Sequence, residues 1–108
     1  MPQIIVKGIT AQETEKMSVD CCPKLGEICS CPSDWFVFDR IQSEFFDETG
    51  KIAHWPVVQV WWFERPQDVQ DGVATCLNDY FKKLGYPGSQ ISFHIFDYSA
   101  YYEDGEHF

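Results

Sequence analysis

The sequence repeats one pattern twice, and this repeat constrains the fold more than any other feature. In each copy a proline, Pro2 or Pro56, precedes a run of β-branched and other apolar residues. Such a run is typical of a strand, and proline is tolerated at the first position of a strand. A helical pattern follows each strand, and a Leu-Gly pair lies near its end, Leu25-Gly26 in the first copy and Leu84-Gly85 in the second. Each copy therefore predicts one strand–helix–strand unit.

The two units span about residues 2–50 and 56–105, inside a single domain of residues 1–108. A strand–helix–strand crossover joins parallel strands with a right-handed connection. Two such units predict an α+β fold, in which a four-stranded mixed sheet carries two helices on one face. Residues 35–38 and 57–63 are apolar at nearly every position, and a chain this short has nothing left to cover the second face. We therefore expect sister subunits to cover it, in a homo-oligomer.

Local signals place the individual elements. Thr10 and Glu13 form a Thr-x-x-Glu capping box, which predicts the start of the first helix. Pro23 lies inside the apolar pattern of that helix, so we expect a kink or a break within one turn of it. Pro66 favours the first position of the second helix. Strands are predicted over residues 3–7, 35–41 with an extension toward Phe46, 51–55, 56–63 and 91–96, and helices over about 10–30 and 66–84.

Charge limits the classes of partner. The net charge of −9 disfavours nucleic acid and anionic membrane surfaces, because both are bound through basic patches. The chain has only two arginines, so Arg40 and Arg65 are the natural groups to hold a small anion. No apolar run is long enough to span a bilayer and no signal peptide is apparent, so we expect a cytoplasmic protein. Nothing in the sequence indicates a cofactor.

The five cysteines do not form a metal-binding or disulfide pattern. Their number is odd, and no Cys-x-x-Cys pair occurs among them. We interpret them as small apolar residues of the core. They are Cys21, Cys22, Cys29, Cys31 and Cys76.

Pro2 is the strongest candidate for catalysis. Removal of Met1 would leave the Pro2 nitrogen as a free secondary amine at the start of the first strand. Burial disfavours the charged form of an amine, so an amine held in an apolar site can act as a general base near neutral pH.

These features together resemble the tautomerase superfamily, which includes macrophage migration inhibitory factor. The resemblance rests on Pro2, the duplicated unit and the chain length of about a hundred residues. The closing Tyr-Tyr-x-x-Gly-Glu-His-Phe, residues 101–108, and Val-Gln-Asp, residues 69–71, are similar to an uncharacterised bacterial branch, a domain of unknown function. The resemblance implies a trimer packed through its sheets, with sites at the subunit interfaces. In each site the proline amine would move a proton between carbon and oxygen of an enol or 2-oxo acid.

The site residues carry over only in part. Pro2 matches the catalytic proline of the family. The smaller tautomerases have an arginine at the start of the first helix. In this chain that place is near Ala11 and contains no arginine, but Arg65 occupies the corresponding place in the second unit. Arg40 lies on the second strand, as a second family arginine does, although in a different register. The resemblance thus implies that Arg65 and Arg40 hold a substrate carboxylate.

Other residues and one alternative remain open. His94 is interpreted as a core or interface residue, His54 as a rim residue and His107 as part of the tail, and no two of them have metal-ligand spacing. By repeat symmetry Tyr101 and Tyr102 match Phe45 and Phe46, which suggests packing. Two strand–helix–strand units also describe ferredoxin-like domains, so a non-catalytic ligand-binding or regulatory module is the alternative function.

Overall fold

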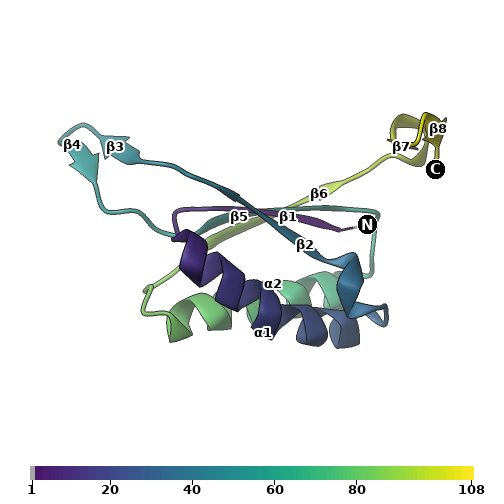
Figure 1. Ribbon diagram of the computed structural model, residues 1–108, viewed down its shortest axis with the longest axis horizontal. Helices are drawn as coiled ribbons and strands as arrows, with labels where there is room; N and C mark the ends of the chain where they lie inside the picture. The colour runs from purple at the N-terminus through teal and green to yellow at the C-terminus, as the bar shows by residue number, and fades with distance from the viewer. Residues whose placement is uncertain (1) are drawn as a thin grey trace.

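A mixed four-stranded sheet forms the centre of the fold, and both helices cover one of its faces (Figure 1). The structure is a computed structural model that describes residues 2–108. The elements of the two units, in chain order, are β1 (Gln3–Lys7), α1 (Ala11–Cys29), η1 (Ser33–Trp35), β2 (Val37–Ile41), β3 (Phe45–Asp47), β4 (Gly50–Ile52), β5 (Val57–Trp62), α2 (Gln67–Lys83), β6 (Gln90–Ile95), η2 (Tyr98–Ala100), β7 (Tyr102–Glu103) and β8 (Glu106–His107). The predicted α+β class with its duplicated unit is confirmed.

The strand order is β2-β1-β5-β6. Within each unit the strands are parallel, β1 with β2 and β5 with β6, and the two units meet where β1 pairs antiparallel with β5. Because β1 and β5 are antiparallel, the start of β1 lies beside the end of β5, with Gln3 opposite Trp61. This register places the N-terminus of one unit next to the segment that leads into the helix of the other.

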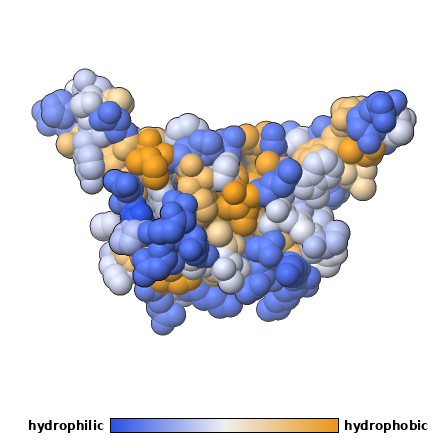
Figure 2. Space-filling view, turned by 180° about the vertical axis from the view of Figure 1, so that it is seen from behind, coloured by the Kyte–Doolittle hydropathy of each residue, from blue (hydrophilic) through white to orange (hydrophobic). Residues whose placement is uncertain are grey.

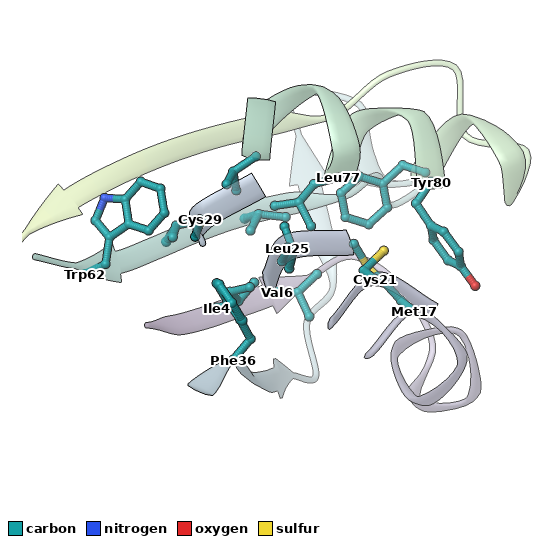
Figure 3. Packing of buried hydrophobic residues seen from close by; sticks show 14 of the residues in the cluster. Ile4, Val6, Met17, Cys21, Leu25, Cys29, Phe36, Trp62, Leu77 and Tyr80 are labelled. Atoms are coloured by element: carbon teal, nitrogen blue, oxygen red, sulfur yellow. The ribbon is translucent and has the colours of Figure 1, made fainter. Parts of the chain in front are cut away.

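One face of the sheet forms the core. Side chains alternate along a strand, so every second residue of β1 and β5 points at the helices. Ile4, Val6, Val58, Val60 and Trp62 are accordingly buried. They belong to one cluster with helix residues such as Leu25 and Leu77, and Figure 3 shows Ile4, Val6 and Trp62 in this packing. Phe81 on α2 is fully buried as well, although the sequence periodicity had not singled it out.

No helix among residues 2–108 covers the opposite face of the sheet (Figure 1). Val37 on β2 is 54% exposed, and Ile5, Val57 and Trp61 are partly exposed, whereas their neighbours in β1 and β5 on the other face are buried. Two hairpins extend beyond this sheet at opposite ends of the molecule, β3–β4 and β7–β8 (Figure 1). Figure 2 shows apolar residues gathered between these two arms.

The start of α1 agrees with its capping box. The Thr10 hydroxyl accepts a hydrogen bond from the Glu13 N–H at 3.0 Å, and the Glu13 carboxylate accepts one from the Thr10 N–H at 2.9 Å. Both bonds join residues three apart, so local sequence determines them.

The predicted break at Pro23 is absent, because α1 continues without interruption from Ala11 to Cys29. Pro23 lacks an N–H and so cannot donate to the carbonyl of Val19, one turn earlier. Both residues lie on the outer side of the helix, where Val19 is 70% exposed and water can satisfy that carbonyl. The loss is therefore small compared with the burial of the opposite face of the helix.

The second strand is shorter than predicted. Trp35 belongs to the short helix η1, in which its N–H bonds to the Pro32 carbonyl at 3.2 Å, and β2 starts only at Val37. Phe36 is 5% exposed and packs into the core, which fixes the chain before the strand begins. The strand does not continue to Phe46, which lies in the separate β3–β4 hairpin. The predicted return strand over 51–55 is in fact β4, Gly50–Ile52, and Pro66 caps α2 rather than opening it.

Candidate functional site

A pocket of about 430 Å³ opens at the end of the sheet where β1 begins. It lies at the end of the sheet that is near the β7–β8 hairpin (Figure 1). Its lining comes from the head of β1, from η1, from the end of β5 and from the C-terminal tail. The lining residues are Pro2, Trp35, Trp62, Phe63, Glu64, Arg65, Tyr98, Glu103 and Phe108.

The strand pairing brings Pro2 and Arg65 to this pocket. Pro2 is buried directly before β1, and Trp62 ends the neighbouring antiparallel strand β5. Arg65 follows three residues later, just before α2 begins at Gln67. Two candidates that are far apart in the sequence, Pro2 and Arg65, therefore line one pocket.

Two buried hydrogen-bond donors in this pocket have no acceptor among residues 2–108. They are the indole Nε1 of Trp62 and the Nε of Arg65. A buried donor without a partner costs on the order of 1–3 kcal/mol, so such groups are rare in native proteins. The guanidinium carbon of Arg65 also lies 5.2 Å from the centre of the Trp62 ring, which holds the two groups together. An acceptor-bearing ligand would satisfy both donors.

The charge of Arg65 is also available. No carboxylate in the described part of the chain lies within salt-bridge distance of it, so Arg65 pairs with neither Glu64 nor Asp68, its acidic neighbours in the sequence. Glu64 and Glu103 line the pocket, but both are exposed to solvent. Arg65 can therefore meet a carboxylate bidentately from one side of the pocket.

Aromatic side chains form one wall. The Phe63 ring stacks on Tyr98 at 4.4 Å and on Phe108 at 5.1 Å between centroids, and Tyr101 meets it edge-on at 5.1 Å. The packing suggested for Tyr101 is thus present, whereas Tyr102 is 60% exposed. Sequence reasoning did not select Trp62, Tyr98 or Phe108 as site residues. For Tyr98 and Phe108 the only signal was the aromatic density of the tail, which does not reveal which strand end the tail meets.

Arg40 does not line this pocket. It pairs with Val6 near the far end of β1, about 13 Å along the strand from Pro2 at 3.3 Å per residue. Its Nε donates a hydrogen bond to the Ile9 carbonyl at 2.8 Å. Within one chain this arginine therefore supports the turn between β1 and α1.

The corresponding place in the other repeat is the start of β5, beside the end of β1, and neighbouring groups of the chain fill it. Gly8 approaches the backbone of Trp55 so closely that a Cβ there would lie 1.8 Å from the Trp55 carbonyl oxygen. The Nδ1 of His54 donates to the Gly8 carbonyl at 2.7 Å, and Phe45 packs edge-on against Trp55 at 4.5 Å. The two ends of the sheet thus differ: these polar groups are paired, whereas the Pro2 end has two buried donors with no acceptor in the described part of the chain, residues 2–108.

The remaining histidines lie apart from the pocket. His94 stacks on Trp61 at 4.3 Å and shares a hydrogen bond with Ser92, on the uncovered face of the sheet. His107 is exposed in β8. Among residues 2–108 no group of three or more His, Cys, Asp or Glu side chains is arranged to hold a metal ion. No helix in the same range is long and apolar enough to cross a membrane.

Comparisons with known proteins agree with this architecture. The family described as "Domain of unknown function (DUF1904)" matches residues 1–107. A crystal structure of a DUF1904 domain from Sebaldella termitidis is 30% identical, with 100% of both chains covered and a TM-score of 0.92. A search of proteins with curated function gave no match.

More distant structures share the fold. A macrophage migration inhibitory factor-like protein from Entamoeba histolytica is 14% identical, with 99% of this chain and 98% of that one covered and a TM-score of 0.78. A structure described as "R7 fused 4-OT wild type asymmetric trimer" is 9% identical, with 97% and 94% covered and a TM-score of 0.82. At these identities the likeness concerns the fold alone. The chain belongs to the DUF1904 family, a domain of unknown function, and it shares its fold with the macrophage migration inhibitory factor-like and fused 4-OT structures.

Proposed function

We propose that the pocket at Pro2 is a cofactor-free active site for enol–keto exchange in a small 2-oxo acid. One observation carries the proposal: Pro2 and Arg65 line the same pocket, where Arg65 Nε and Trp62 Nε1 are buried donors that find no acceptor among residues 2–108. A 2-oxo acid offers a carboxylate and a neighbouring oxygen on one small frame. Its geometry therefore suits two adjacent donors beside a base.

Pro2 would supply the base. Once Met1 is removed, its secondary amine can take the hydroxyl proton of the enol, and the resulting ammonium can give a proton to carbon 3. The sum converts enol to ketone with no net change in the protein, and the reverse order serves the opposite direction. The protein needs no redox partner for this exchange, because no electrons are transferred to or from the substrate.

Arg65 and Trp62 would hold the substrate. The guanidinium binds the carboxylate, and the Trp62 N–H donates to the oxygen on carbon 2, where negative charge develops as the proton moves. A preorganised donor at that position stabilises the transition state more than the ground state. The aromatic wall around Phe63 would hold the organic part of the substrate away from water.

The proposal includes a homotrimer packed through the uncovered sheet faces. Val37 at 54% and Ile41 at 47% exposure are large apolar side chains on that face, and burying them favours association. The description of the fused 4-OT structure as a trimer points the same way. Sedimentation at micromolar concentration should show about three chains per particle, and a stable monomer would remove this part of the proposal.

The test of catalysis is an enol–keto assay with phenylenolpyruvate on protein whose loss of Met1 has been verified by intact mass. A positioned base contributes about a hundred- to ten-thousand-fold, so Pro2→Ala should lose much of the rate; some activity should remain because alanine keeps an amine. Undetectable turnover by Met1-free protein that still binds 2-oxo acids would favour the ligand-binding module instead.

A further inference from the structure

The pocket at Pro2 contains charges of both signs that do not pair with each other. Arg65 supplies the positive charge of its lining, and Glu64 and Glu103 supply two negative charges. Within residues 2–108 neither carboxylate lies within salt-bridge distance of the guanidinium. A ligand that carries both signs of charge would therefore complement both parts of the pocket.

The positive part of the pocket is its buried part. Trp62 is 1% exposed, and its indole Nε1 and the Nε of Arg65 are buried donors that find no acceptor among residues 2–108. These donors and the guanidinium charge favour an anionic group with more than one acceptor oxygen. The carboxylate and the neighbouring oxygen of a 2-oxo acid fit this part.

The part of the pocket that faces solvent combines aromatic rings with the two carboxylates. Tyr98 is 59% exposed and Phe108 is 54% exposed, and both rings stack on Phe63, at 4.4 and 5.1 Å between centroids. Glu64 and Glu103 are exposed beside them. The face of an aromatic ring attracts a cation, and groups of such rings bind quaternary ammonium ligands. This part of the pocket therefore suits a positively charged group.

We propose that the substrate of this site is a zwitterionic 2-oxo acid, whose far end carries an ammonium, quaternary ammonium or guanidinium group. This inference rests on the proposed function, because it assigns the substrate class of the same pocket. The carboxylate binds Arg65, and the cationic group lies against Tyr98 and Phe108 with Glu64 and Glu103 as its counter-charges. The cation takes no part in the proton transfer between oxygen and carbon 3.

The same charges disfavour a substrate with a second carboxylate. Arg40, the other arginine of the chain, donates to the Ile9 carbonyl near the far end of β1 and is not part of the lining. A dicarboxylate held by Arg65 would bring its second charge toward Glu64 and Glu103, and the net charge of −9 adds to the repulsion. A neutral apolar end would contact the rings but leave both carboxylates without a counter-charge.

Three phenylpyruvates that differ only in the para substituent separate these cases. A trimethylammonio group carries the positive charge, a tert-butyl group has nearly the same shape without the charge, and a carboxylate carries a negative charge. Calorimetry on the wild-type protein at low ionic strength gives their dissociation constants without turnover. The trimethylammonio compound should bind about tenfold more tightly than the tert-butyl compound, and the dicarboxylate should bind most weakly. Added salt should reduce the differences.

Equal affinities for the trimethylammonio and tert-butyl compounds would overturn the proposal, and so would tightest binding of the dicarboxylate. Arg65→Ala should weaken all three compounds by a similar factor, because all three share the 2-oxo acid carboxylate. A loss confined to the dicarboxylate would show that Arg65 does not hold that shared group, which also contradicts the proposal.

Two glutamine variants test the counter-charges. Glu64→Gln and Glu103→Gln each remove one carboxylate with little change of shape, so each should reduce the preference for trimethylammonio over tert-butyl by about two- to fivefold. Glu48→Gln makes the same change of charge in the turn of the β3–β4 hairpin, so this matched control should keep the full preference. An undiminished preference in the folded double variant of Glu64 and Glu103 would contradict the role of these carboxylates.

The proposed substrate class and the proposed catalysis fail in different ways. Selective binding of the trimethylammonio compound without turnover by Met1-free protein would support the ligand class and contradict the catalysis. Turnover of phenylenolpyruvate without any preference for the positive charge would support the catalysis and contradict the ligand class.

Discussion

The guanidinium carbon of Arg65 lies 5.2 Å from the centre of the Trp62 indole ring, and each residue has a buried N–H without an acceptor in residues 2–108. The two side chains come from one turn of chain, the link from β5 into α2. Their relation to Pro2 comes from the antiparallel pairing of β1 with β5. The local link after β5 therefore positions Trp62 and Arg65, and the pairing of β1 with β5 brings Pro2 to the same pocket.

Replacing Trp62 tests its indole N–H. Trp62→Phe removes the Nε1 donor while keeping an aromatic ring, so we expect kcat/KM for the 2-oxo acid to fall about tenfold, the value of one hydrogen bond. Trp35→Phe is the matched control, because Trp35 lines the same pocket but is 42% exposed. Equal losses in the two variants would assign the effect to pocket shape rather than to the donor.

The two arginines are predicted to behave differently. Arg65→Ala should raise KM about 10- to 100-fold, because a charged hydrogen-bonded pair is lost, and Arg65→Lys should recover only part of it, since lysine cannot bind a carboxylate bidentately. Arg40→Ala should lower the melting temperature through loss of its bond to Ile9 and leave KM unchanged. The reverse pattern, with KM raised only in Arg40→Ala, would show that a neighbouring subunit delivers Arg40.

Glu13 should make the fold sensitive to acid. Burial alone would raise the pKa of its carboxyl, but hydrogen bonds from the Thr10 N–H and the Tyr86 hydroxyl hold the pKa below 4.5. The folded state then binds this proton less tightly than the unfolded state. The stabilisation is therefore fully present above about pH 4.5 and is lost as the pH falls through the lower folded-state value.

Urea denaturation at several pH values measures this contribution. Glu13→Gln should flatten the loss of stability between neutral and acid pH, whereas Glu15→Gln, an exposed position on the same helix, should follow the wild type. Identical pH profiles for wild type and Glu13→Gln would show that Glu13 does not contribute to the acid sensitivity of the fold.

Gly8 should tolerate no side chain. Its φ is +86°, and a Cβ would lie 1.8 Å from the Trp55 carbonyl oxygen, so Gly8→Ala should destabilise the fold by more than about 2 kcal/mol. Gly88→Ala is the control, since nothing lies within 4 Å of a Cβ there, and its effect should stay within about 0.5 kcal/mol. Thermal denaturation of the two variants compares their stabilities. Similar melting temperatures would contradict the close contact between Gly8 and the Trp55 backbone.

The features predicted correctly are those with local or periodic causes. The Thr10–Glu13 capping box depends on residues three apart, and the strand that begins at Val57 follows from its run of β-branched and aromatic residues. The repeat gave the topology because each copy carries the same order of elements. Pro23 was misjudged because its cost depends on the exposure of Val19, which only the packed helix reveals.

The pocket was less accessible to sequence reasoning. The family resemblance implied that Pro2 and Arg65 share a site, but their approach within one chain depends on which strands pair at the centre of the sheet. Trp62 was interpreted as a strand residue, and nothing in its neighbours indicates that its N–H lacks an acceptor.

The central claim is that the free amine of Pro2 is the base, and one comparison tests it most directly. Two preparations that differ only in Met1 are assayed with phenylenolpyruvate across the pH range, after intact-mass verification of each. Retaining Met1 converts the amine to an amide, which cannot accept the proton. The account predicts that the Met1-free form turns over with a rate that rises with pH through the amine pKa, and that the Met1-retaining form is inactive. Equal rates in both forms would contradict it.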